Sequence, residues 1–195
     1  LKDNDELLKV KNTYGDANIM IVTQNGYAVR FNEKNVRAMG RTASGVKAIN
    51  LKDDDVAVCM DIAVDGEELL VISENGFGKR TPVSEYKVQN RGGVGLITYK
   101  ISEKTGKLTG ATICKVDDEL MLINSSGVAI RINVADISVT NRSAMGVTLM
   151  RTTEDEKVVA IAKILSSDDS EEDEEKLESN TTPETIEENS SESNS

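Results

Sequence analysis

Histidine and tryptophan are both absent from the 195-residue chain, and tyrosine and phenylalanine together make up only 3% of it. Without histidine the chain lacks the commonest general base of enzymes and the commonest metal ligand. Its two cysteines, Cys59 and Cys114, lie in apolar runs and are too few for a structural zinc site, so we expect buried, reduced thiols. No run of 18 apolar residues is present, which excludes a membrane-spanning helix by sequence. The charged first residues also lack the apolar stretch of a signal peptide.

The net charge of −11 is confined to the C-terminal segment. Residues 166–195 contain 12 acidic residues and one lysine, whereas the preceding residues contain 22 acidic and 22 basic side chains. The segment has no aromatic residue and too few apolar ones to offset the entropy lost on ordering. We therefore expect a neutral folded body and a disordered acidic tail at 166–195, whose acids could compete with a polyanion for basic residues of the body.

Three stretches of the body are near-copies of one another. They are IMIVTQNGYAVR (19–30), ELLVISENGFGKR (within 67–80) and ELMLINSSGVAIR (119–131). Each has an apolar run, a turn signal and a short strand that ends in arginine. The turn glycines are Gly26, Gly76 and Gly127, so the period is 50 and then 51 residues. A period in this range indicates a solenoid, a propeller or an array.

The repeat extends beyond the turn. An arginine follows four residues after each turn glycine, a second arginine after fifteen, and a second glycine after nineteen. The first arginines are Arg30, Arg80 and Arg131, the second are Arg41, Arg91 and Arg142, and the second glycines are Gly45, Gly95 and Gly146. Three columns in common register indicate that most of each unit is repeated.

Each unit consists of apolar and β-branched runs of four to six residues, separated by Gly, Asn, Asp and Ser, which is a strand pattern. Asn25-Gly26 and Asn75-Gly76 predict hairpins with type I′ turns. About four strands per unit is typical of one propeller blade. We predict an all-β domain at 1–165, with a last strand of an earlier blade in 1–13 and repeats at 18–63, 67–116 and 118–164. Because three blades would leave exposed sheet edges, we expect further blades before residue 1.

No active site is expected in these repeats. The paired acids lie in solvated turns, serine has no histidine partner, and the glycine-rich stretch at 89–95 lacks the spacing of a Walker or dinucleotide loop. The repeated arginines are more informative, because equivalent positions in a ring lie on one rim. They predict a basic stripe that binds the backbone of DNA or RNA, with the second glycines allowing close approach to phosphates. The stripe would contain Arg30, Arg41, Arg80, Arg91, Arg131 and Arg142, with Lys79 beside them.

Two alternatives stay open from the residues alone. One is a propeller that binds a protein partner. The other is a structural array in which each repeated arginine pairs with an acid or packs its stem between blades.

The stretch ENGFGKRTPVSEYKVQNRGGVG (74–95) closely resembles a late blade of the C-terminal domain of bacterial DNA gyrase A. NGYAVRF and SSGVAIRINVADISVTNRSAMGV resemble neighbouring blades, so the resemblance covers about residues 1–164. It implies a β-pinwheel, a propeller variant whose blades exchange strands. Such a domain wraps duplex DNA on a basic rim, so that the ATP-hydrolysing type IIA topoisomerase introduces negative supercoils. At matching positions the seven basic residues of the stripe would contact DNA.

The resemblance also implies partners and location. These are the breakage–reunion domain of gyrase A and the gyrase B protein, in an A2B2 enzyme of the bacterial cytoplasm and nucleoid, with no membrane contact. ATP and Mg²⁺ would bind elsewhere in that enzyme, and this chain would hold no cofactor or catalytic residue. Residues 89–95 have the shape of the family's Gln-Arg-Arg-Gly-Gly-Lys-Gly-type box, but Asn90 and Val94 replace basic residues, so we expect the true box upstream. The equivalent domain of topoisomerase IV is the alternative within the family.

Overall fold

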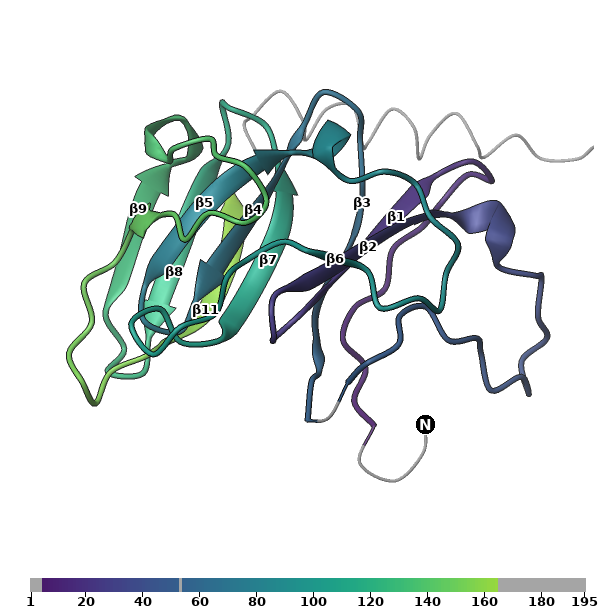
Figure 1. Ribbon diagram of the computed structural model, residues 1–195, viewed down its shortest axis with the longest axis horizontal. Coiled ribbons are helices and arrows are strands. Elements are labelled where there is room, and N and C mark those ends of the chain that lie inside the picture. The colour runs from purple at the N-terminus through teal and green to yellow at the C-terminus, as the bar shows by residue number, and fades with distance from the viewer. Residues whose placement is uncertain (1–4, 53, 165–195) are drawn as a thin grey trace, which may run out of the picture. The chain divides into compact units, whose positions relative to one another are not determined.

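Strands make up nearly all the regular structure of this protein. The computed structural model describes residues 5–52 and 54–164, which contain eleven strands and three short 3-10 helices (Figure 1). The strands form three separate antiparallel sheets, which we call blades 1, 2 and 3. The all-β prediction is therefore confirmed, whereas the acidic tail predicted at 166–195 lies outside the described residues.

Each blade is built mainly from one repeat. Blade 1 has the order β3-β1-β2-β6, blade 2 the order β10-β5-β4-β7 and blade 3 the order β11-β8-β9. The strands of blade 1 are β1 (Asn18–Thr23), β2 (Tyr27–Asn32), β3 (Ala57–Ile62) and β6 (Leu96–Ile97). Those of blade 2 are β4 (Glu68–Ser73), β5 (Phe77–Pro82), β7 (Leu108–Cys114) and β10 (Val147–Thr148). Those of blade 3 are β8 (Glu119–Asn124), β9 (Ala129–Asn133) and β11 (Val158–Ile164). The 3-10 helices are η1 (Glu33–Asn35), η2 (Val83–Glu85) and η3 (Val134–Asp136).

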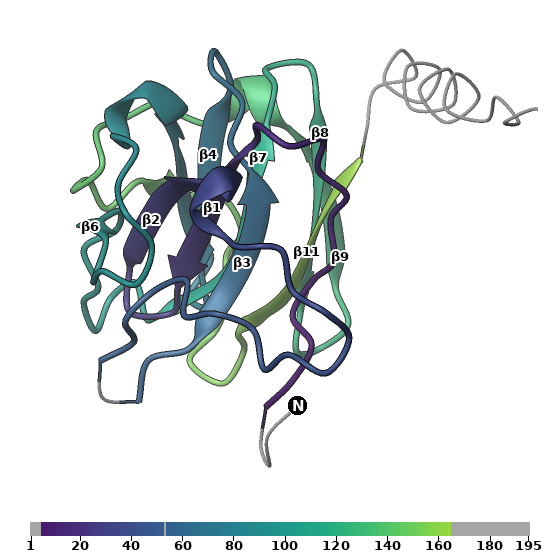
Figure 2. The same cartoon turned by 90° about the vertical axis from the view of Figure 1, so that its right-hand side faces the viewer.

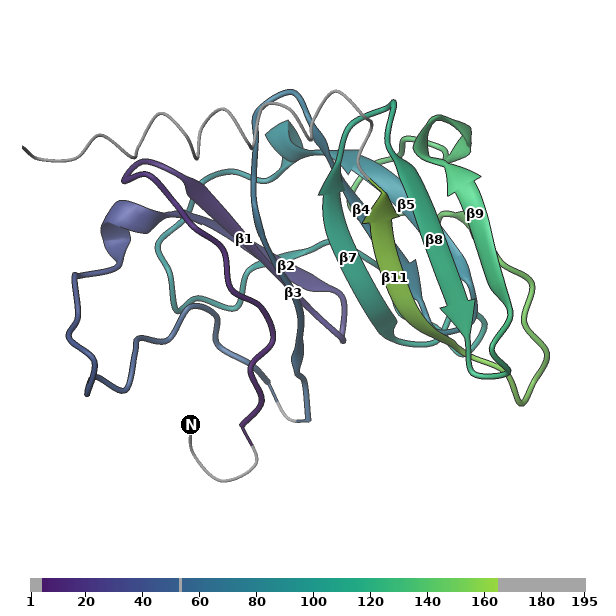
Figure 3. The same cartoon turned by 180° about the vertical axis from the view of Figure 1, so that it is seen from behind.

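Neighbouring blades exchange a strand. β6 belongs to the second repeat by sequence but pairs with β2 of blade 1, where Tyr27 faces Ile97 (Figure 2). In the same way β10 of the third repeat pairs with β5 of blade 2, where Phe77 faces Thr148. The long strands β3, β7 and β11 lie next to one another in turn (Figure 3). This exchange is the pinwheel arrangement, and it makes each sheet depend on the repeat that follows.

The three hairpin turns share one geometry. β1 and β2 are joined by residues 24–26, and the Gly26 N–H donates to the Thr23 carbonyl at 3.0 Å. Gly26, Gly76 and Gly127 all have φ near +80°, which favours glycine because it has no Cβ. Two of the turns were predicted as two-residue type I′ loops. They are instead three-residue loops, in which a tight turn is followed by a left-handed glycine.

Apolar side chains fill the two spaces between the blades. Met20 and Val22 of blade 1 pack in one cluster with Leu69 and Val71 of blade 2. The side chains that alternate with these along β4 point the other way, so Leu70 joins a second cluster with residues of blade 3. Blade 2 is thus buried on both faces. Each fully buried aliphatic side chain is worth about 1.5–3 kcal/mol, so these two interfaces hold the array together.

The N-terminal segment differs from the prediction. Residues 5–13 form no β-ladder and are largely exposed, so the last strand expected in 1–13 is absent from the described part of that stretch. Lys9 and Lys11 lie 3.9 and 3.2 Å from the carboxylate of Asp61 on β3. Ion pairs, rather than backbone hydrogen bonds to a neighbouring strand, hold this segment near blade 1.

Candidate nucleic-acid interface

The first arginine column ties each blade to the next one. Arg30 lies on β2 and is only 5% exposed. Its Nη1 donates to the Val83 and Tyr86 carbonyls of the second repeat at 3.4 Å, and its Nη2 lies 2.6 Å from Asp65. These partners compensate for the burial of the charge, although Nε has no hydrogen-bond partner. Arg30 therefore directs its donors toward blade 2.

Arg80 repeats this arrangement one blade later. It lies on β5, is 6% exposed, and donates from Nε to the Ile137 carbonyl of the third repeat at 2.8 Å. Its Nη1 pairs with Glu68 of the neighbouring strand at 2.5 Å. The same residue at the same register thus joins blade 2 to blade 3.

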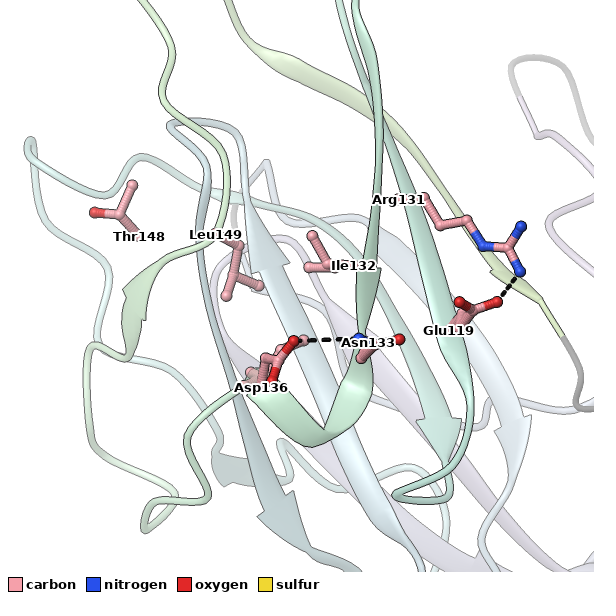
Figure 4. A pocket seen from close by; sticks show the side chains of 8 residues that line it. Glu119, Arg131, Ile132, Asn133, Asp136, Thr148 and Leu149 are labelled. Atoms are coloured by element: carbon pink, nitrogen blue, oxygen red, sulfur yellow. Dashed lines mark hydrogen bonds and ion pairs between the residues drawn. The ribbon is translucent and has the colours of Figure 1, made fainter.

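Arg131 holds the equivalent position on β9, but no blade follows it among the described residues. Its side chain is 58% exposed and pairs with Glu119 of its own blade. Figure 4 shows the two side chains pointing toward each other at an open pocket that Asp136 and Leu149 also line. The contact between Arg131 and Glu119 raises the pKa of the guanidinium further. Arg131 thus forms an ion pair within its own blade but, among the described residues, makes none of the hydrogen bonds to a following repeat that Arg30 and Arg80 make.

The structure shows no continuous basic stripe at the surface through Arg30, Arg80 and Lys79. All three are buried, so each would have to be uncovered before a phosphate could contact it. The contacts of Arg30 and Arg80 match the structural alternative, in which the repeated arginine packs between blades. A four-residue spacing from the turn glycine shows that the side chains share a face of the sheet, but not that the next blade covers that face.

The second arginine column lies at the surface, on the loops that lead to the exchanged strands. Arg91 donates from Nε to the Asn35 carbonyl at 2.9 Å and from Nη1 to the Lys47 carbonyl at 3.0 Å. Arg142 donates from Nη1 to the Ile97 carbonyl at 3.1 Å, and its side chain is 33% exposed. Both guanidinium groups anchor their loop while keeping part of their surface in solvent.

Arg41 lies at the corresponding place in the first repeat and is exposed. In the part of the chain that the structure describes, no blade precedes blade 1 to receive its loop. Arg41, Arg91 and Arg142 are thus the three predicted cations that occupy equivalent, accessible loop positions. Further exposed cations are Lys34, Arg37, Lys47, Lys87, Lys100 and Arg151.

The second glycines fit these loops closely against a strand of the preceding blade. A Cβ on Gly95 would lie 2.5 Å from the Ala28 carbonyl oxygen, and one on Gly146 would lie 2.2 Å from that of Gly78. Both glycines also have φ near +80°. Their role in the structure is thus close packing between blades, and not the exposure of backbone N–H groups that we expected. A Cβ on Gly45, for which the described residues contain no preceding blade, would meet nothing within 4 Å.

Lys79 has a role that the sequence did not reveal. It lies on β5 beneath the Arg142 loop, with Nζ 2.5 Å from the Asn141 carbonyl and 2.6 Å from the Arg142 carbonyl. Burial lowers the pKa of this ammonium to about 8, although Glu85 acts in the opposite direction. The adjacent arginine suggested a surface cation, whereas the structure shows that the Lys79 side chain points inward.

Nothing in the described residues forms a site for catalysis by a metal ion or a thiolate. No group of three or more Cys, Asp or Glu side chains among them is placed to hold a metal ion. Cys59 and Cys114 are buried and unpaired, as predicted, and burial raises the pKa of each thiol to about 12. Across the described ranges, no helix has the length and apolar character that crossing a bilayer requires.

Known structures share this fold. A structure of the DNA gyrase A C-terminal domain matches with a TM-score of 0.73 and 28% identity, over 78% of this chain and 52% of that one. The crystal structure of the C-terminal domain of DNA topoisomerase IV matches with a TM-score of 0.82 and 26% identity, over 93% of this chain and 57% of that one.

Sequence relatives point to gyrase within this pair. The DNA gyrase A protein of Clostridium acetobutylicum is 58% identical over 168 residues, which are 86% of this chain and 20% of the relative. That of Staphylococcus epidermidis is 44% identical over 189 residues, which are 95% of this chain and 21% of the relative. The chain thus spans about a fifth of the length of these relatives.

The family model described as the DNA gyrase C-terminal domain, beta-propeller, matches residues 17–58, 67–115 and 118–164. These three segments contain ten of the eleven strands completely and the first two residues of β3. The chain therefore belongs to the family of DNA gyrase C-terminal β-propeller domains.

Proposed function

We propose that this chain binds duplex DNA and wraps it across successive blades, as part of a DNA gyrase A protein. The observation that carries the proposal is the match of all three repeats, in register, to the gyrase C-terminal family. The structure adds a surface of suitable chemistry, because equivalent loops of successive repeats each present an arginine. Arginine forks suit phosphate oxygens, so the binding would be to backbone and sensitive to salt.

The contacts that we propose are Arg41, Arg91 and Arg142. Arg91 and Arg142 are each fixed to the preceding sequence repeat by a hydrogen bond from Nη1. Arg131 is a further accessible cation at the end of blade 3. Arg30, Arg80 and Lys79 would support DNA binding indirectly, by holding the blades and loops in place.

The proposed function also involves the other parts of a DNA gyrase A protein and its partners. In the whole protein this domain, at 1–165 with its acidic tail at 166–195, would follow further blades and the breakage–reunion domain. Together with gyrase B in an A2B2 enzyme it would promote ATP-driven negative supercoiling in the bacterial cytoplasm, on the nucleoid. These statements rest on the family, since the chain spans only about a fifth of its gyrase relatives.

The test is a titration of a ~100 bp duplex with the 195-residue chain over a salt series. Each phosphate neutralised should steepen the dependence of log K on log salt by about 0.9. Replacing Arg41, Arg91 and Arg142 together by alanine should reduce that slope by roughly 2 to 3 and weaken binding at least tenfold.

The matched control replaces Lys52 and Lys104, which lie over the rings of Tyr27 and Phe77 beside the hairpin turns. This double variant also loses exposed positive charge but leaves the interblade loops intact, so its slope should change little. Equal losses in the two variants would reject the loop surface as the DNA track. Absence of binding by the unmodified chain at low salt would reject DNA binding by these blades and favour a propeller that binds a protein.

A further inference from the structure

Lys79 is the most deeply buried cation among the described residues. Its relative exposure is 0%, and its ammonium contacts the carbonyls of two consecutive residues, Asn141 and Arg142. The ring of Tyr99 lies 5.9 Å away on another side. Lysine is almost never fully buried unless partners compensate for the lost hydration. Two carbonyl acceptors and an aromatic face provide that compensation here.

Of the three repeats, only the second has a lysine at this position. The residues at the same distance from the turn glycine are Val29 in the first repeat and Ile130 in the third. Both are apolar, as the pattern of an inward-facing strand position predicts. The lysine therefore departs from the repeat at the place where the Arg142 loop crosses β5.

The loop that Lys79 contacts is otherwise pinned at its edges. Arg142 donates from its backbone N to Glu85 at 3.3 Å and from Nη1 to the Ile97 carbonyl. At the far end, Gly146 lies directly against Gly78, and the Leu149 N–H donates to the Gly76 carbonyl. The Asn141 carbonyl also accepts from the Ala144 N–H at 3.3 Å, so loss of the ammonium would remove one of two donors to Asn141 and the donor to the Arg142 carbonyl.

We propose that Lys79 is a positioning residue for DNA binding, whose buried ammonium holds the loop of Asn141 and Arg142 in the conformation that presents Arg142 to a phosphate. This inference rests on the proposed function, because it assigns a support to one of its contacts. It differs from the sequence prediction, in which Lys79 itself was a DNA contact. A tenfold loss of DNA affinity on removal of the Lys79 ammonium would result from displacement of the loop of Asn141 and Arg142. It would not result from the loss of a contact between Lys79 and a phosphate.

The charged groups around Lys79 influence the pH at which its ammonium, which holds the loop, loses a proton. Glu85 on η2 favours the ammonium, Arg142 on the loop opposes it, and Tyr99 contacts it as a neutral ring. Because burial brings the pKa of Lys79 to about 8, its charge changes between pH 7 and 9. Deprotonation removes the charge from the hydrogen bonds to the two loop carbonyls, so the exchange of the loop and the affinity for duplex DNA should differ between pH 7 and 9, while most exposed lysines keep their charge.

The experiment compares Lys79→Met with Lys100→Met in the 195-residue chain. Methionine keeps the length of the buried stem and removes the ammonium, whereas Lys100 is an exposed lysine of the same sequence repeat. Hydrogen exchange of peptides covering 140–149 should speed up in the first variant and stay unchanged in the second. Duplex affinity at pH 7 should fall about tenfold in the first and at most about twofold in the second.

A double-mutant cycle with Arg142→Ala tests whether Lys79 acts through the loop. Lys79→Met should cost at most about twofold in the Arg142→Ala background, since the presented side chain is already gone. The pH dependence between 7 and 9 should also disappear in Lys79→Met and persist in Lys100→Met. A tenfold cost that is unchanged by Arg142→Ala, or equal losses in the two lysine variants, would overturn the inference.

Two readouts keep this test apart from that of the proposed function. If the unmodified chain fails to bind duplex DNA, the proposed function fails, and the inference that rests on it fails too. If the unmodified chain binds DNA but its loop exchange, corrected for the intrinsic pH effect, is the same at pH 7 and 9, the inference alone fails. That second measurement needs no variant, so it holds even if Lys79→Met does not fold.

Discussion

Blades 2 and 3 are built from similar sequence repeats, but matching residues of the two blades differ in burial and in their contacts. Arg80 of blade 2 is 6% exposed and bound to the carbonyl of Ile137, whereas Arg131 of blade 3 is 58% exposed at its side chain and bound only within its own sheet. Leu70 of blade 2 is fully buried, whereas Met121 at the matching position of blade 3 is partly exposed. The sequence of each repeat is similar, but what the residues do depends on whether a blade lies beyond them.

This difference shows where the stability of the array comes from. In repeat architectures each unit contacts mainly its neighbours, so stability is close to a sum of unit and interface terms. Here the interface term includes apolar packing, an arginine and an exchanged strand. Blade 2 has all three on the side toward blade 3, while the equivalent side of blade 3 lacks them in the described residues. Substitutions at matching positions should therefore differ in cost.

The turn glycines give the largest expected contrast. A Cβ on Gly76 would lie 1.9 Å from the Met150 carbonyl oxygen, whereas one on Gly127 would meet nothing within 4 Å. Since both glycines have φ near +80°, both alanine variants lose about 1 kcal/mol to the left-handed conformation. Gly76→Ala should lose about 4 kcal/mol of unfolding free energy in total, because the exchanged strand must move. Urea unfolding monitored by circular dichroism measures both, and equal losses would contradict the role of the neighbour.

The arginine pair gives the next contrast. Arg80→Met should lower the unfolding free energy by about 3 kcal/mol, because Glu68 is left as a partly buried charge and the Ile137 carbonyl loses its donor. Arg131→Met should cost less than about 1 kcal/mol, since its pair with Glu119 is exposed to solvent. The same unfolding experiment applies. A cost for Arg131→Met as large as that for Arg80→Met would show that the interblade contacts contribute nothing.

The smallest expected effect concerns the pH dependence of stability. The pKa of Lys79 falls from 10.5 to about 8 on folding, so between these values the unfolded chain binds more protons at this site than the folded chain. The contribution of Lys79 to stability should therefore rise with pH from 8 to 10.5. The unfolding free energy of the unmodified chain should therefore rise relative to that of Lys79→Met over this range. A difference that is flat or falls would show that Lys79 is not buried as a charged group.

Much of the fold could be predicted because local rules decide it. Alternating apolar residues and the turn glycines at a constant period require short strands joined by hairpins, whatever lies around them. The length of the hairpin loops was harder to predict, since Asn-Gly fits both a two-residue loop and a three-residue loop with a left-handed glycine. The exchange of β6 and β10 was implied only by the family resemblance, because nothing in a short stretch such as Leu96–Ile97 states which sheet it joins.

The candidate site was predicted less well, for a physical reason. Spacing places Arg30, Arg80 and Arg131 on the same face of their strands, but burial of that face depends on the next blade. Arg41, Arg91 and Arg142 lie on loops, where the sequence signal of a repeated arginine beside a glycine led to accessible positions. Lys79 could have been questioned from sequence alone, since its counterparts Val29 and Ile130 are apolar.

The sequence by itself determined the all-β class, the repeat period, the positions of the turns and the separation of a neutral body from an acidic tail. These properties depend on composition and on residues that are close together in the chain. Only the tertiary structure decided which cations face solvent and which join blades, because that depends on contacts between residues about 50 positions apart. Arg80 and Arg131 make this plain, since the residue and its local sequence position are the same and only the presence of a neighbouring blade differs.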